Sequence, residues 1–208
     1  MKILNLEQGS EEWKQARIGR ITGTRLGDAI GTPAKQEALL NELIAEALTE
    51  QSKEIFINSA MKHGTEAEDY AIAEYEQMTG EITEQVGFCL HDEYDWLANS
   101  PDRLIKSKGK YRKAVEVKAP NSETAVKYIR GGKIPKEYEG QVMSYFLVNE
   151  DLQELDFVIF DPRIRNERYR LTVFHMERDE AKIAEAWEKL IRFYNQWQQA
   201  LADLKLTF

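Results

Sequence analysis

The sequence predicts an α/β (α+β) fold in which helices flank a central mixed β-sheet. Apolar side chains recur at helical spacing from about residue 10 to residue 78, and the pattern changes to short β-type runs between residues 82 and 118 and again between 155 and 174. A long amphipathic helix is expected from about residue 179. Because 208 residues supply one full hydrophobic core and no repeat or Pro/Gly-rich linker divides them, we expect a single domain over residues 1–208.

Four helices are expected before the first strand. They are placed over Ser10–Ala16, from near Thr22 or Gly23, over residues 36–50, and over Thr65–Met78. Ser10 fits an N-cap, since its hydroxyl can accept a bond from a free backbone N–H. The third helix gathers its apolar residues on one face, namely Leu39, Leu40, Leu43, Ile44, Ala47 and Leu48. Gly80 ends the fourth helix.

Five strands are expected, at Ile82–Leu90, Trp96–Ile105, Tyr111–Lys118, Leu155–Phe160 and Tyr169–Phe174. The first three follow one another closely and are interpreted as an antiparallel meander. Helices around residues 122–130 and 136–148 separate them from the last two. The closing helix begins near Asp179, with an apolar face of Ile183, Trp187, Leu190, Ile191, Tyr194, Trp197, Leu201 and Leu204. We expect its tryptophans to belong to the core, with a subunit interface as the alternative.

Composition indicates a globular protein of the cytoplasm with no membrane association. Hydrophobic residues make up 42% of the chain and charged residues 31%. No run approaches the ~18 consecutive apolar residues of a membrane span, and the first residues turn polar too early for a signal peptide. A single cysteine, Cys89, excludes a disulfide within the chain and any four-cysteine zinc or iron–sulfur site.

The net charge of −8 is unevenly distributed. Residues 64–102 contain eleven acidic and no basic residues, whereas residues 103–136 contain eleven basic and two acidic ones, and a further basic run extends over Arg163–Arg170. Such segregation predicts an electropositive surface on an otherwise acidic protein, as phosphate-binding proteins require. For the lysine-rich turn at residues 106–110, an ordinary solvated turn is an equal alternative.

Asp102, Glu116 and Lys118 form the most informative pattern. Side chains at i and i+2 of a strand leave on the same face, so Glu116 and Lys118 point together, and a hairpin would bring Asp102 opposite them. Two carboxylates offer hard oxygen ligands to Mg²⁺, and the carbonyl of Val117 would add another. The Lys118 ammonium would polarise an attacking water and offset charge on a phosphate. The pattern predicts a metal-dependent phosphodiester-cleaving site; a surface hairpin with cross-strand Glu–Lys pairs is the alternative.

Three further positions have candidate roles. Glu68 would face the site from a helix as a metal or water ligand, or would close a capping box with Thr65. His63, near the start of that helix, is interpreted as a satisfied polar residue, with ligation as the alternative. Arg17, together with the glycines and hydroxyls up to Thr24, would hold a phosphate at a helix start, or would belong to a capped loop with exposed arginines.

Six short motifs occur in one order over roughly residues 7–165, about three quarters of the chain. They are Trp13…Arg17-Ile18-Gly19…Ile21-Thr22, Gly64-x-x-x-Glu68, Ser100-Pro101-Asp102, Glu116-Val117-Lys118, Gln141-Val142 and Phe160-Asp161-Pro162-Arg163. Each is common by itself, but the six together resemble the phage lambda exonuclease and YqaJ-type viral recombinase family of the PD-(D/E)xK nuclease superfamily. The resemblance implies a restriction-endonuclease-like PD-(D/E)xK core.

The family resemblance implies an Mg²⁺-dependent exonuclease that digests one strand of linear double-stranded DNA from 5′ to 3′. Two metal ions per active site are implied, with Mn²⁺ as a substitute. The resemblance also implies a homotrimeric ring around the DNA, which gives processivity, and a single-strand annealing protein as the partner in phage-type DNA recombination.

The same resemblance implies roles by position. The implied metal ligands are Glu68, Asp102, Glu116 and the Val117 carbonyl. Lys118 is implied as the catalytic lysine, and Gln141 as a residue near the attacking water. The 5′-phosphate would be held by Arg17, Thr24 and Ser100. Thr24 stands where the phage enzyme has a serine, and this keeps a hydroxyl donor. No role carries over to His63.

Two alternatives stay open. One is a restriction-like or Holliday-junction-type endonuclease with the same core, and the other is a non-catalytic DNA-binding or trimeric scaffold. RecB-type relatives that carry an iron–sulfur cluster are disfavoured because Cys89 alone cannot hold one.

Overall fold

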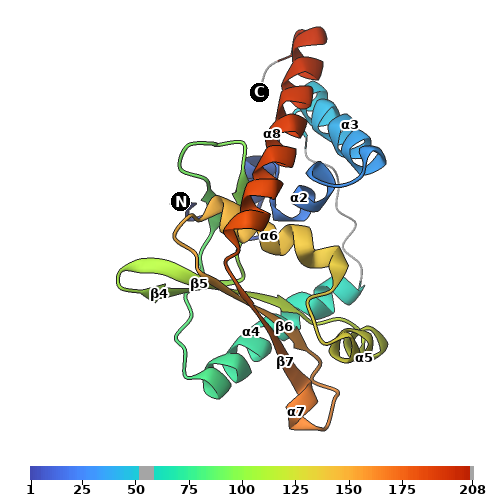
Figure 1. Cartoon of the computed structure of the whole chain (residues 1–208). Coiled ribbons are helices and arrows are strands. Elements are labelled where there is room, and N and C mark those ends of the chain that lie inside the picture. Colours follow the sequence, from blue (N-terminus) through green and yellow to red (C-terminus); the bar gives the residue numbers. More distant parts are fainter. Residues whose placement is uncertain (52–58, 207–208) are drawn as a thin grey trace.

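Helices lie on both faces of a mixed β-sheet, which confirms the predicted fold class (Figure 1). The structure, a computed structural model, describes residues 1–51 and 59–206, and for residues 59–66 it describes the helical backbone alone. Within the residues described, no helix is long and apolar enough to cross a membrane.

Four strands form the main sheet in the order β4-β5-β6-β7. Their bounds are Arg103–Ser107 for β4, Lys110–Lys118 for β5, Glu154–Phe160 for β6 and Leu171–Glu177 for β7. β5 and β6 are parallel and the other neighbours antiparallel, so the sheet is mixed. The parallel pair requires a crossover. It consists of α5 (Ser122–Gly131), the 3₁₀ turn η1 (Lys136–Tyr138) and α6 (Glu139–Val148).

The predicted three-strand meander is wrong, because its strands divide between two sheets. The smaller sheet is antiparallel and contains β1 (Lys2–Leu4), β2 (Phe88–Leu90) and β3 (Ala98–Asn99), in that order. The predicted strand Trp96–Ile105 is interrupted at Ser100-Pro101-Asp102. Proline has no backbone N–H to donate to a ladder, so pairing stops there and resumes in the main sheet.

Two further strand boundaries differ from the prediction. Residues 82–87 pair only through one bridge, between Glu84 and Leu104, and the side chain of Ile82 is 82% exposed. Tyr169 and Arg170, predicted as strand, belong to the short helix α7 (Glu167–Arg170), because Asn166 caps it by accepting from the Arg168 N–H. β7 therefore begins at Leu171.

The N-terminal helices follow the prediction. They are α1 (Glu11–Arg17), α2 (Gly23–Ala29) and α3 (Pro33–Thr49), and the Ser10 hydroxyl caps α1 by accepting from the Trp13 N–H at 3.1 Å. α4 (Ser59–Thr79) begins earlier than predicted. Thr65 therefore lies inside the helix and cannot be its N-cap. Gly80 ends α4 as expected, with a left-handed φ of +73° that glycine adopts without strain.

The main sheet separates two hydrophobic clusters. α4 covers one face, where Ala67, Ala71, Ile72 and Tyr75 pack with Val115, Val117, Val158 and Phe160. The opposite face packs with α6 and the C-terminal helix α8 (Glu180–Asp203), through Ala114, Leu155, Phe157 and Ile159 of the sheet. In Figure 1, α4 accordingly lies below the sheet and α6 above it.

The closing helix α8 begins where predicted, since the Asp179 side chain accepts from the N–H groups of its first turn. Trp197 is 1% exposed and belongs to the core, whereas Trp187 is partly buried against it. Leu204 is 54% exposed at the end of the helix, so its placement on the apolar face was wrong.

Candidate active site

Glu116 and Lys118 leave β5 on the same face, the face that packs against α6. The Lys118 ammonium forms an ion pair with the Glu116 carboxylate. Asp102, directly before β4, accepts a hydrogen bond from the Val117 N–H at 2.8 Å. The hairpin therefore brings Asp102 opposite the β5 pair, as the spacing predicted.

Helix α6 holds the Glu116 carboxylate from above. Gln141 donates through Nε2 to Oε1 at 2.7 Å, and the Tyr145 hydroxyl donates to Oε2. Glu116 is only 1% exposed, and protein groups donate to both of its oxygens, as a buried carboxylate requires. Tyr145 was not among the residues predicted from the sequence, although its position four residues after Gln141 places both on one helix face.

The charged groups of this site shift one another's pKa values. Burial, followed by repulsion from Glu116, raises the pKa of Asp102 well above its usual range, and Lys118 offsets only part of this. Burial lowers the pKa of Lys118, but attraction to Glu116 and Asp102 outweighs burial and raises it overall. Lys118 is therefore a cation at neutral pH.

Glu68 lies in the third turn of α4, and its interpretation as the end of a capping box is wrong because α4 starts at Ser59. Arg103 holds it instead, through Nη1 to Oε1 at 3.0 Å, and also contacts Asp69 at 2.9 Å. Burial raises the pKa of Glu68, and Arg103 counteracts this. Arg103 was not among the residues predicted from the sequence, because its partners lie on α4, far from it along the chain.

The donor chemistry of this group fits a hard divalent cation. Asp102, Glu116 and Glu68 are carboxylates that influence one another electrostatically, and such oxygens are the ligands that Mg²⁺ prefers. In the described part of the chain, however, no three acidic, histidine or cysteine side chains are gathered as a preformed metal cluster. Lys118 pairs with Glu116, and Arg103 pairs with Glu68. A bound cation would replace these two contacts.

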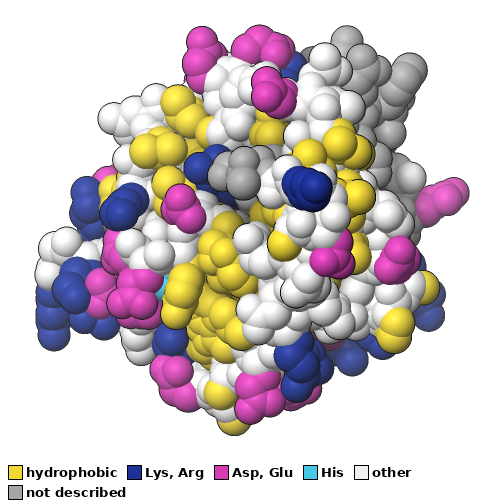
Figure 2. All heavy atoms as spheres, turned by 90° about the horizontal axis from the view of Figure 1, so that it is seen from above, with side chains coloured by type: hydrophobic (Ala, Val, Ile, Leu, Met, Phe, Trp, Pro, Cys, Tyr) yellow, Lys and Arg dark blue, Asp and Glu magenta, His cyan; other side chains and the backbone are white. Residues whose placement is uncertain are grey.

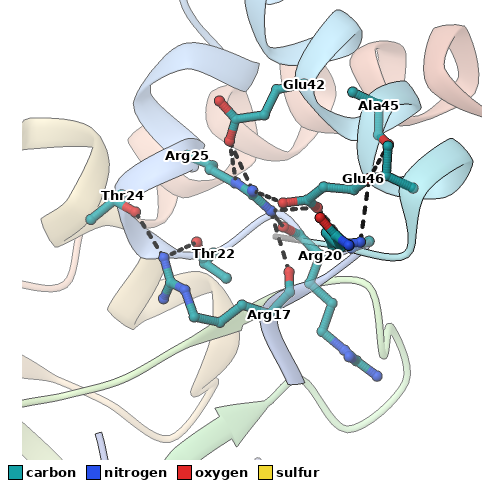
Figure 3. A network of polar contacts seen from close by, with 11 residues as sticks. Arg17, Arg20, Thr22, Thr24, Arg25, Glu42, Ala45 and Glu46 are labelled. Carbon is teal, nitrogen blue, oxygen red and sulfur yellow. Dashed lines mark hydrogen bonds and ion pairs between the residues drawn. The ribbon is translucent and has the colours of Figure 1, made fainter. Parts of the chain in front are cut away.

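A second polar group surrounds Arg17 at the end of α1. Its guanidinium donates to the hydroxyls of Thr22 at 3.2 Å and Thr24 at 3.4 Å (Figure 3), and stacks 4.3 Å from the centre of the Trp13 ring. The Trp13 indole donates to the Ser100 hydroxyl at 2.9 Å. This contact joins the Arg17 group to the Ser100-Pro101-Asp102 segment, and hence to the carboxylates.

Arg17 keeps its charge at neutral pH. Burial, with a contribution from Arg25, lowers the pKa of Arg17 to about 10. A partly desolvated guanidinium with two hydroxyl neighbours is suited to bind a phosphate.

Helices α2 and α6 are in backbone contact, which fixes the two polar groups relative to each other. A Cβ added to Gly140 of α6 would lie 2.3 Å from the Cα of Gly27 in α2. Thr24 on α2 and Gln141 on α6 are thus held on adjoining helices, and only glycine permits this approach.

The motif Phe160-Asp161-Pro162-Arg163 lies at the end of β6. Arg163 forms an ion pair with the buried Asp161 at 2.7 Å and donates to the Pro120 carbonyl at 3.0 Å. The end of β6 is thereby tied to the loop that follows Lys118. Arg170, in the same basic run, pairs with Glu74 at 3.0 Å.

The lysine-rich turn agrees with the solvated alternative. Lys106 pairs with Glu84 at 2.8 Å and Lys110 with Asp151 at 2.7 Å, all on exposed side chains. On the face shown in Figure 2, basic and acidic side chains are interspersed around hydrophobic ones, so this face is not the predicted electropositive surface. The side chain of His63 lies outside the described residues.

Known proteins match this chain over most of its length. A family model described as the YqaJ-like viral recombinase domain matches residues 12–151. The crystal structure of an alkaline exonuclease, LHK-Exo, from Laribacter hongkongensis is 33% identical with a TM-score of 0.85, covering 94% of this chain and 96% of that one. LHK-Exo in complex with dAMP gives 32% identity and the same TM-score and coverage.

A phage-related exonuclease from Haemophilus somnus 129PT shares the fold, at 17% identity and a TM-score of 0.64 over 89% of this chain and 96% of that one. A comparison with curated proteins finds no significant match. The family model covers more than half of the chain, and the resemblance that the six motifs predicted is confirmed. The chain belongs to the YqaJ-like viral recombinase family.

Proposed function

We propose that this protein is a metal-dependent exonuclease that digests one strand of linear double-stranded DNA from its 5′ end. The observation that carries the proposal is the link between two sites through the Ser100-Pro101-Asp102 segment. The Trp13–Ser100 hydrogen bond joins the Arg17 group, suited to a terminal phosphate, to the carboxylate–lysine group of Asp102, Glu116 and Lys118.

The relatives support this substrate class. LHK-Exo, 33% identical over nearly the whole chain, is an alkaline exonuclease, and it has been crystallised with dAMP. A deoxynucleoside monophosphate is the product expected from stepwise cleavage of a DNA strand. The same two polar groups in one chain would accommodate the terminal phosphate and the next phosphodiester.

The chain's own residues divide the work. Lys118, kept protonated by its acidic neighbours, would donate to the scissile phosphate or to the attacking water. Gln141 and Tyr145 fix the orientation of Glu116, and Gln141 would also reach the water. Arg17, Thr24 and Ser100 would hold the 5′-phosphate, which sets the distance from the end to the cut.

Asp102, Glu116, Glu68 and the Val117 carbonyl would hold two Mg²⁺ ions or Mn²⁺. Bound ions of this kind activate water and neutralise charge on the phosphate. Exchange of the Glu68–Arg103 and Glu116–Lys118 contacts would free the carboxylates for this role. A homotrimeric ring and a single-strand annealing protein as partner belong to the same proposal and rest on family membership.

The test is digestion of linear duplex labelled at the 5′ or the 3′ end, in Mg²⁺ and in EDTA, beside closed circular DNA. We expect early release of the 5′ label as mononucleotide, delayed release of the 3′ label, and resistance of the circle. Cutting of closed circles would instead support the endonuclease alternative. Binding without any cleavage would support the scaffold.

A further inference from the structure

Arg17 is the last residue of α1, and hydrogen bonds hold the backbone there and in the short connection to α2. The connection turns at Gly19, whose φ of +65° is left-handed. The Gly19 N–H donates to the buried Glu46 of α3 at 3.0 Å. The carbonyls of Arg17 and Arg20 both accept from one guanidinium nitrogen of Arg25, at 3.3 and 2.9 Å.

Arg25 is the centre of this network (Figure 3). Its guanidinium engages both oxygens of Glu46 in a bidentate pair and contacts Glu42 at 2.8 Å. Glu46 is 2% exposed and the Arg25 side chain 12%, so the pair is desolvated. One planar donor group thus connects two carboxylates of α3 to two carbonyls, one at the end of α1 and one in the connection to α2.

A buried ion pair of this kind is a weak device for stability alone, because the desolvation cost offsets most of the attraction. What distinguishes this pair is where its remaining hydrogen bonds go. The Arg17 and Arg20 carbonyls and the Gly19 N–H belong to the segment whose shape directs the Arg17 side chain.

The charges are arranged to suit a phosphate. Arg25 lies close enough to Arg17 to depress its pKa, while Glu42 and Glu46 act in the opposite direction. The ion pairs of Arg25 with Glu42 and Glu46 offset its positive charge. Arg17 is left as the cation that faces the Thr22 and Thr24 hydroxyls.

We propose that Arg25, held by Glu42 and Glu46, is a positioning residue that sets the Arg17 guanidinium for a terminal 5′-phosphate. This rests on the proposed function, because it presumes that Arg17 contacts that phosphate. Arg25 itself does not touch the DNA.

The test is equilibrium binding to a DNA hairpin with a single duplex end, labelled away from that end and carrying either a 5′-phosphate or a 5′-hydroxyl. Fluorescence anisotropy in EDTA measures both affinities without cleavage. The readout is the ratio of the two dissociation constants. Variants are Arg17→Ala, Arg25→Lys and the apolar pair Arg25→Met/Glu46→Met, with Glu37→Gln on the exposed face of α3 as the matched control.

We expect Arg25→Lys to lower the preference for the phosphorylated end about tenfold, because an ammonium preserves the charge but cannot serve four acceptors. The apolar pair should lose the preference to a similar extent, because neither methionine can hold the Gly19 N–H or the carbonyls of Arg17 and Arg20. Glu37→Gln should leave the preference unchanged. Retained affinity for the 5′-hydroxyl end together with a lost preference for the phosphorylated end separates positioning from a general structural role.

Two results would overturn the proposal. Retention of the wild-type preference by Arg25→Lys and by the apolar pair removes the positioning role while leaving the Arg17 contact in place. A wild-type ratio of one, unchanged in Arg17→Ala, refutes the phosphate contact in the proposed function and the positioning role with it.

Discussion

Tyr145→Phe tests how the buried carboxylate of Glu116 is maintained. Glu116 is 1% exposed, and among the described contacts the Tyr145 hydroxyl is the donor to Oε2, whereas Oε1 is shared by Gln141 and Lys118. The substitution removes one hydrogen bond to a charged group without creating a large cavity. A bond of that kind contributes about 1.5–3 kcal/mol, which corresponds to roughly 3–12 °C in the melting midpoint of a chain of this size.

Urea unfolding in EDTA measures this loss, with Tyr111→Phe as the matched control. Tyr111 also donates to a glutamate, Glu84, at 2.7 Å, but that carboxylate is 42% exposed and water can replace the donor. We expect the control to lose less than about 1 kcal/mol. Equal losses in the two variants would refute the reasoning, because burial of the acceptor is the difference between them.

The same Tyr145→Phe variant should cut DNA more slowly. In this variant the Glu116 carboxylate is held at Oε1 alone and would position bound metal ions less accurately. We expect a tenfold to hundredfold fall in single-turnover rate, which corresponds to about 1.4–2.7 kcal/mol. An unchanged rate would show that Gln141 and Lys118 suffice to orient the carboxylate.

Three further predictions concern the surroundings of the site. At neutral pH, Asp102→Asn should abolish cleavage in Mg²⁺ and should raise the melting midpoint in EDTA. A carboxyl with a raised folded-state pKa destabilises the fold increasingly as pH rises from its unfolded-state pKa to its folded-state pKa, so a midpoint gain that persists below about pH 3 would contradict this. Trp13→Phe keeps an aromatic ring under Arg17 but removes the hydrogen bond to Ser100. It should weaken binding of a phosphorylated DNA end, measured by anisotropy, by about 0.5–1.5 kcal/mol. Unchanged binding would show that this hydrogen bond does not connect the two sites functionally. Gly140→Ala should lower the free energy of unfolding in urea by at least about 1–3 kcal/mol, because its Cβ would lie 2.3 Å from a backbone carbon of α2. The control Gly131→Ala, whose Cβ would have nothing within 4 Å, should be neutral or slightly stabilising. Equal effects of the two substitutions would contradict the close contact between α2 and α6.

Features governed by local physics could be predicted from the sequence. The i, i+2 spacing sufficed to place Glu116 and Lys118 together, because strand alternation requires it. Ser10 and Asp179 were placed at helix starts because a cap depends on the neighbouring backbone alone. Pro101 carried a signal for a strand break that the prediction of one long strand did not use.

Features that depend on distant segments could not be predicted. Arg103 meets Glu68 because α4 lies across the sheet, and Arg25 meets Glu46 because α3 packs beside α2. Neither placement follows from spacing along the chain. The division of the strands into two sheets is likewise decided by pairing between residues far apart, such as Lys2 with Leu90.

The central claim is that Lys118 and the carboxylates beside it form the cutting site, and two lysines of β5 allow a matched test. Lys118 pairs with Glu116 on the α6 face, and Lys113 pairs with the buried Asp156 at 2.8 Å on the opposite face. The measurement is single-turnover release of nucleotides from 5′-phosphorylated linear duplex in Mg²⁺ by Lys118→Met and Lys113→Met, after folding of both is verified by circular dichroism. We expect Lys118→Met to lose about 100-fold or more and Lys113→Met to stay within a few-fold of the wild type. Cleavage by Lys118→Met at the wild-type rate would contradict the claim.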